Sequence, residues 1–116
     1  MKYIKMFENL NELQVGDYVA CEDTRDYSRN KYYGNEMGNI LKKFIYNNVG
    51  EYFSIDKDVN YSNTYYILVK YDNVPKELKR YFKKNKTRYI QEYDIKFWSK
   101  NKEDVEAYIA EKKYNL

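Results

Sequence analysis

Apolar and aromatic residues gather in short stretches along the chain, and polar stretches separate them. The strongest example is 64–71, which is rich in aromatic and β-branched residues and predicts a strand. In 87–97 aromatic and branched residues partly alternate with polar ones, which also indicates a strand. The same criteria, with Gly and Asn turns between the stretches, predict five strands in all, over 18–21, 38–46, 51–55, 64–71 and 87–97.

Two further segments have helical spacing. Pro75 suits the first position of a helix, and the apolar residues that follow it are spaced by three and four, which predicts a short helix near 75–82. A C-terminal helix near 101–113 is predicted from an inward stripe of Val105, Tyr108, Ile109 and the stem of Lys112. The polar stretches 23–35 and 56–63 predict loops.

These elements favour one α+β domain over residues 1–116. Strands joined by short turns form antiparallel sheets, and a small sheet buries one face by curling or by packing against a helix. We therefore expect a curved antiparallel sheet of about five strands, a short helix near 75–82 and a C-terminal helix near 101–113.

Three short patterns follow one another along the strands: Gly16-Asp17-Tyr18-Val19, Gly38-Asn39-Ile40 and Tyr66-Ile67-Leu68-Val69-Lys70-Tyr71. Together they resemble the strands of small SH3-like barrels of the Tudor and KOW kind, over about residues 16–72. The resemblance implies a small β-barrel and a binding role, because Tudor-like folds bind methylated side chains, peptides or nucleic acid. The aromatic cage of those domains matches no position here, so the resemblance supplies no site residue.

The residue types exclude most catalytic chemistry. The chain has no histidine and one cysteine, which excludes Ser–His and Cys–His nucleophile pairs, histidine metal sites and an internal disulfide. Cys21 lies beside Glu22 and Asp23, whose charges favour the neutral thiol. The P-loop, the Gly-rich dinucleotide motif and the nucleophile elbow are absent from the sequence. We expect no enzyme activity, no catalytic residue and no cofactor.

Metal binding and membrane insertion are not expected either. Asp56 and Asp58 begin like a calcium loop, but Tyr61 occupies the position that requires glycine. No stretch approaches the roughly 20 apolar residues that span a bilayer, and residues 1–8 have no signal-peptide core. The sequence therefore predicts a cytoplasmic chain with no membrane partner.

Positive charge is concentrated in 76–88. This segment contains seven basic residues and one acidic residue, so its net charge is +6, whereas that of the whole chain is +3. Its aromatic residues lie among the cations, a combination that suits phosphates and exposed bases, although a solvated helix with its aromatics in the core gives the same pattern. The candidate binding residues here are Lys79, Arg80, Lys83, Lys84, Lys86 and Arg88.

A second cluster of cations and tyrosines lies in the predicted loop 23–35. Tyrosine offers a large contact area at a low cost in side-chain entropy, so such loops make good protein-binding surfaces; a mobile surface loop is the alternative. The candidate binding residues here are Arg25, Tyr27, Arg29, Tyr32 and Tyr33. The chain has 16 tyrosines, more than a core of this size needs, so some are expected to be exposed.

The composition also indicates an origin. Lys, Asn, Tyr and Ile make up nearly half of the chain and all have AT-rich codons, which is typical of low-GC bacteria and their phages. We expect a non-catalytic binding module, a small phage or mobile-element accessory protein that binds and inhibits a larger host protein such as a defence nuclease. The alternatives are a nucleic-acid-binding small barrel that uses 76–88, and a pocket for an anionic nucleotide-like ligand.

Overall fold

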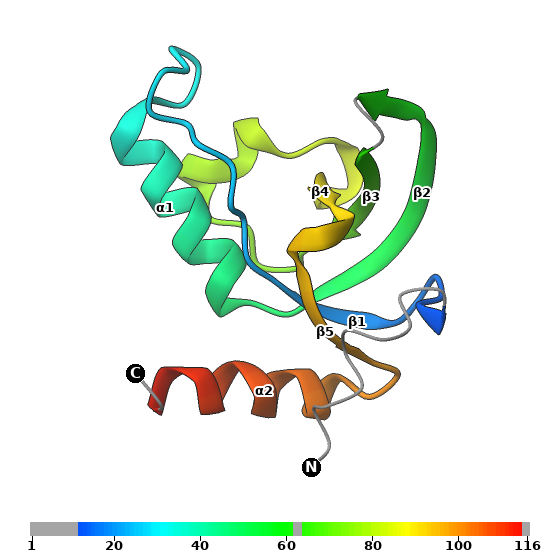
Figure 1. The fold of residues 1–116 in the computed structure, drawn as a ribbon. Helices are drawn as coiled ribbons and strands as arrows, with labels where there is room; N and C mark the ends of the chain where they lie inside the picture. The colour runs from blue at the N-terminus through cyan, green and yellow to red at the C-terminus, as the bar shows by residue number, and fades with distance from the viewer. Residues whose placement is uncertain (1–11, 62–63, 115–116) are drawn as a thin grey trace.

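The computed structural model describes residues 12–61 and 64–114, and side chains for 12–54 and 66–114. The strands are β1 (Tyr18–Cys21), β2 (Gly50–Tyr61), β3 (Thr64–Lys70), β4 (Thr87–Gln91) and β5 (Ile95–Ser99). They form one five-stranded antiparallel sheet in the order β4-β3-β2-β1-β5 (Figure 1). The helices are α1 (Gly34–Asn47), α2 (Lys102–Tyr114) and the short 3-10 helices η3 (Lys76–Tyr81), η4 (Lys84–Lys86) and η5 (Glu92–Asp94).

The predicted α+β class is confirmed, with its five-stranded antiparallel sheet, its short helix after Pro75 and its C-terminal helix. The sheet is curved because the pairing register shifts in β1, between Ala20 and Cys21, and twice in β2. Such bulges bend a strand and increase its twist, and β2 is a long arc in Figure 1. The strand pairs that the structure describes leave β4 and β5 at the two edges, so the sheet is open.

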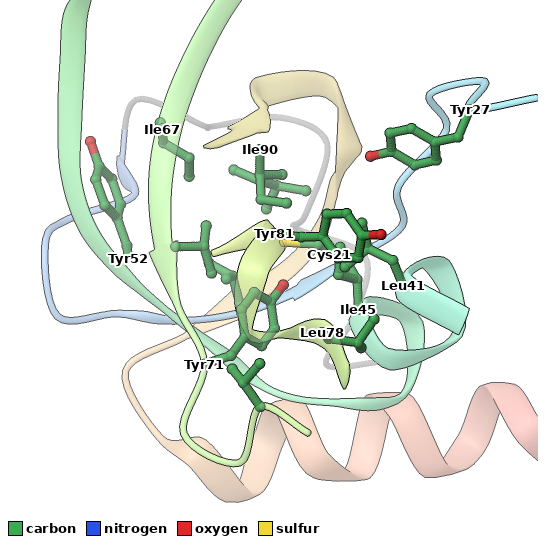
Figure 2. Close-up of a cluster of buried hydrophobic side chains, with 14 residues drawn as sticks. Cys21, Tyr27, Leu41, Ile45, Tyr52, Ile67, Tyr71, Leu78, Tyr81 and Ile90 are labelled. Carbon is green, nitrogen blue, oxygen red and sulfur yellow. The ribbon is translucent and has the colours of Figure 1, made fainter. Parts of the chain in front are cut away.

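β1 is buried on both faces because its side chains alternate between two cores. Val19 and Cys21 belong to the larger core, where Leu41 and Ile45 of α1 lie close to Cys21 (Figure 2). Ala20 belongs to a second core, with Phe97, Val105 and Ile109. The helices α1 and α2 therefore pack on opposite faces of the sheet at β1 (Figure 1).

The predicted strand over 38–46 is wrong, because this segment lies within α1. Gly38, Leu41 and Ile45 are its buried residues, and their spacing of three and four places them on one helical face. That face packs against the larger core, which outweighs the strand propensity of the segment. The middle pattern of the SH3-like resemblance is therefore helical, and the resemblance itself stays a prediction.

Two other boundaries also differ from the predictions. The segment 87–97 is two strands rather than one, because η5 separates β4 from β5. Asp94 holds η5 in place: its carboxylate accepts hydrogen bonds from Thr24 Oγ1 (2.7 Å) and Thr24 N (3.3 Å). The predicted loop 56–63 is also wrong up to Tyr61, since β2 continues to that residue and pairs with β3. The side chains of Asp56 and Asp58 lie outside the part that the structure describes.

Candidate functional site

The fold brings the two predicted cation–tyrosine clusters together. Tyr32 OH donates a hydrogen bond to the Arg80 carbonyl oxygen (2.7 Å), and Tyr81 OH donates to the Tyr32 carbonyl oxygen (3.3 Å). These bonds join positions 48 and 49 residues apart in the sequence. The loop before α1 and the η3 helix therefore form one continuous surface, which the sequence presents as two separate segments.

Stacked rings hold this surface together. The Tyr33 and Tyr81 rings stack with centroids 4.7 Å apart, and the Tyr32 ring meets each of them edge-on at 5.1 Å. The Arg80 guanidinium lies 4.9 Å from the Tyr32 ring centroid and 5.4 Å from that of Tyr81, a cation–π geometry. The Tyr32 side chain is nevertheless 49% exposed. We call this the basic-aromatic surface and define it by Tyr32, Tyr33, Lys79, Arg80 and Tyr81.

A buried ion network lies behind the basic-aromatic surface, built on the carboxylate of Asp23. Arg25 donates to both carboxylate oxygens, from Nε (3.1 Å) and Nη2 (3.3 Å). Tyr27 OH also donates to Asp23, and Arg88 Nη2 donates to Tyr27 OH (2.6 Å). Arg88 is 5% exposed, and its Nη1 donates to the Tyr81 carbonyl oxygen (2.8 Å). The network therefore ties the loop to β4 and to the end of η3.

The protonation of the network follows from its surroundings. Burial alone raises the pKa of Asp23, but the hydrogen bonds and charge of Arg25 and the hydrogen bond from Tyr27 outweigh it and lower the pKa below its ordinary value. Burial raises the pKa of Tyr27, so the phenol keeps the proton that it donates. Asp23 is therefore ionised at neutral pH and compensates the charges of the two arginines around it.

The structure places the eleven predicted binding residues in three groups. Arg25, Tyr27 and Arg88 belong to the buried ion network; Tyr27 and Arg88 are buried, and Arg25 is partly exposed. Tyr32, Tyr33, Lys79 and Arg80 lie in the basic-aromatic surface. Arg29, Lys83, Lys84 and Lys86 are exposed outside it.

Sequence reasoning used Asp23 only as a charge beside Cys21, and it left Tyr81 either among the cations of 76–88 or facing the core. The structure buries Tyr81 in the larger core. Asp23 lies two residues before Arg25 and four before Tyr27, a local spacing that could have indicated the ion pair. The contacts of Tyr81 with Tyr32 and Tyr33 could not have been predicted, because these two residues lie in a loop that is far away in the sequence.

The structure offers little for nucleophilic or metal chemistry. Burial raises the pKa of the Cys21 thiol to about 12, so the thiol is neutral at physiological pH. Among the residues that the structure describes, no group of three or more Cys, Asp or Glu side chains is placed to hold a metal ion.

Three hollows lie away from Tyr32 and Arg80. One of about 400 Å³ lies between the end of α1 and α2, and one of about 410 Å³ lies between residues 22–24 and α1. A third, of about 110 Å³, includes Tyr27 in its lining. The predicted nucleotide-like pocket of Tyr and Arg side chains coincides with none of these three.

Comparison with protein-family models, with curated proteins and with solved structures gave no match. Within the described residues, no helix has the length and apolar character needed to cross a bilayer. The function is therefore inferred from the basic-aromatic surface itself.

Proposed function

We propose that this chain is a non-catalytic binding module that docks on a larger protein through the basic-aromatic surface. The observation that carries the proposal is Tyr32, whose ring is about half exposed although its hydroxyl and its carbonyl oxygen are both hydrogen-bonded. Tyrosine and arginine are enriched at the energetic centres of protein interfaces. Here both are held in place before binding, which lowers the entropic cost of association.

The charges of the surface define the partner's chemistry. Arg80 lies against the exposed Tyr32 ring and Lys79, next to it in η3, is also exposed, so the matching patch is acidic, with a hollow that accepts a tyrosine ring. A partner of this kind is a larger host protein, such as a defence nuclease, whose inhibition would suit a small accessory protein of a phage or mobile element. Part of this proposal comes from the AT-rich codon signature of the sequence.

The test is affinity capture from a host lysate, with and without nuclease treatment, followed by measurement of the affinity of the captured protein. Tyr32→Ala and Arg80→Ala should each weaken binding by about 30-fold, the effect of removing a residue worth about 2 kcal/mol at an interface. Arg80→Lys keeps the charge but loses the planar group, so it should also weaken binding.

Tyr114→Ala serves as the matched control, because Tyr114 is 87% exposed at the end of α2, an element that is not part of the surface. The proposal is wrong if the captured protein binds the Tyr32 and Arg80 variants as tightly as the unchanged chain. It is also wrong if nuclease treatment removes all captured material.

A further inference from the structure

The outward face of the β3–β4 ladder carries a second group of aromatic residues. Leu68 pairs with Tyr89 and Tyr66 with Gln91, and paired residues share one face of a sheet. Their neighbours Ile67, Val69 and Ile90 point the other way, into the larger core. Because α1 packs on that core and α2 packs on β1 and β5, the outward positions of β3 and β4 lie on another side of the molecule and are partly exposed.

The side chains on this face form an ordered strip. The Tyr66 and Tyr89 rings meet edge-to-face, with centroids 6.4 Å apart and planes at 83°. Gln91 Nε2 donates a hydrogen bond to Tyr66 OH (3.3 Å). Since these residues come from paired strands, their rings are carried on a rigid support. We call this group the outer aromatic strip and define it by Tyr66, Leu68, Tyr89 and Gln91.

Cations flank the outer aromatic strip. Lys83 Nζ lies 4.5 Å from the centroid of the Tyr89 ring, and Lys70 follows Leu68 on the same face. At the end of the face where Lys70 pairs with Thr87, the Thr87 hydroxyl donates a hydrogen bond to the Lys84 carbonyl oxygen of η4 (3.0 Å). The η4 helix carries two lysines, Lys84 and Lys86. Glu51, paired with Lys70, is the acidic residue at this end of the strip. At the Lys70 end of the strip, beside Tyr89, the named cations therefore outnumber the acidic residue.

We propose that the outer aromatic strip binds single-stranded nucleic acid, with bases stacked on Tyr66 and Tyr89 and phosphates bound by Lys83 and Lys70. Aromatic rings on the face of a sheet, bordered by cations, bind unpaired bases without sequence preference. The phosphate attracts the Lys83 ammonium away from the Tyr89 ring, and the base then occupies the ring face. A duplex keeps its base faces stacked, so it cannot make this contact.

The geometry favours a nucleic acid over a protein at this strip. The Tyr66 and Tyr89 rings lie on paired strands, and the Lys83 ammonium lies against the Tyr89 ring. Planar bases need only a ring surface and a nearby cation. The inference goes beyond the proposed protein partner and uses none of the residues that define the basic-aromatic surface.

The test is fluorescence anisotropy with a labelled 20-nucleotide oligothymidylate, titrated at about 50 and 200 mM salt. Tyr66→Leu and Tyr89→Leu remove a ring but keep apolar volume, and each should weaken binding by about 10-fold. Lys83→Gln, an exposed position with little risk to folding, should weaken binding and reduce the slope of log affinity against log salt by about 0.7.

Tyr114→Leu and Lys113→Gln are the matched controls, because both residues are exposed on α2. They should leave the affinity unchanged, and an unlabelled duplex should compete poorly. The inference is overturned if the folded chain does not bind the oligonucleotide at the lower salt, if a duplex competes equally well, or if the Tyr66, Tyr89 and Lys83 variants bind like the controls. Such a result leaves the Tyr32 and Arg80 experiment unaffected, so the two proposals fail separately.

Discussion

Asp23 joins the side chains of the buried ion network through one carboxylate. It accepts hydrogen bonds from Arg25 and Tyr27, and its Oδ2 lies 4.0 Å from Arg88 Nη2. Removal of its charge leaves Arg88, which is 5% exposed, without a compensating anion. An uncompensated buried charge is among the most costly defects that one substitution can create.

We therefore expect Asp23→Asn to lower the free energy of unfolding at pH 7 by about 3 kcal/mol, the scale of a broken buried ion pair. Urea denaturation measures the change. Glu36→Gln removes a carboxylate from an exposed position in the first turn of α1 and should have a much smaller effect. Equal losses for the two variants would show that the network does not stabilise the fold.

The pH dependence of this difference has a definite sign. The pKa of Asp23 is lower in the folded chain than its ordinary value of 3.8, so its contribution is present above that pH and is lost as the pH falls through the folded pKa. Burial raises the pKa of Asp94, which gives the opposite slope. The stability gap between the unchanged chain and Asp23→Asn should therefore stay constant from pH 7 to about 5 and shrink below about 4. A gap that persists undiminished in acid contradicts this assignment.

Arg88 illustrates what a sequence leaves open about single residues. Its place in a basic segment predicts an exposed, phosphate-binding cation, but the Arg88 side chain is buried. Its hydrogen-bond partner Tyr27 lies 61 residues away in the chain. A contact over that separation depends on the whole fold, whereas the exposure of Lys79 and Arg80 follows from local helical spacing.

Among the elements, α1 depends on a close approach to the loop before it. A Cβ added at Gly38 would lie 2.8 Å from Tyr27 Cβ. Both atoms are fixed by their backbones, so one segment would have to move. The helix and the buried ion network are therefore coupled at this point.

Gly38→Ala should consequently destabilise the chain, although alanine at a helix interior normally stabilises it by about 0.5–1 kcal/mol relative to glycine. We expect a net loss of about 1–2 kcal/mol, since overpacking in a fitted core costs about 1–3 kcal/mol. Thermal unfolding measures it. Asn39→Ala, at the next and exposed position of α1, should raise the midpoint slightly. A higher midpoint for Gly38→Ala would exclude the steric contact.

The elements were predictable where the local pattern was unambiguous. β1, β3 and α2 were found near their observed bounds, because alternation, branched residues and capping signals agree there. The segment 38–46 mixes branched and aromatic residues with helical spacing, and only its packing into the larger core beside β1 decides in favour of a helix. The break at η5 depends on the contact of Asp94 with Thr24, 70 residues earlier, which no local pattern contains.

Across the whole molecule, the two cores differ in size. Among the residues whose side chains the structure describes, the larger core contains 14 buried residues and the second contains four. Local unfolding begins where few apolar contacts hold an element. α2, which is held by the second core, is therefore expected to open before the sheet and α1 do.

Hydrogen exchange should accordingly show weaker protection for the amides of α2 than for those of α1. Val105→Ala removes two buried methyl groups and should speed exchange in α2 by about tenfold, while α1 is unaffected. Leu41→Ala, in the larger core, should speed exchange in both helices. Uniform exchange across α1 and α2 in the unchanged chain would mean that the molecule unfolds as a single unit.

β1 contacts both cores although it has only four residues. A bulkier side chain in this strand finds no free space on either side, whereas the exposed positions of two outer segments, the loop before α1 and the η3 helix, can vary without disturbing it. A lineage under pressure to change partners would then diversify these outer segments and keep the strand nearly constant. Distant homologues would be recognised by the stretch Tyr18–Cys21 and its flanking turn long after their binding surfaces had diverged.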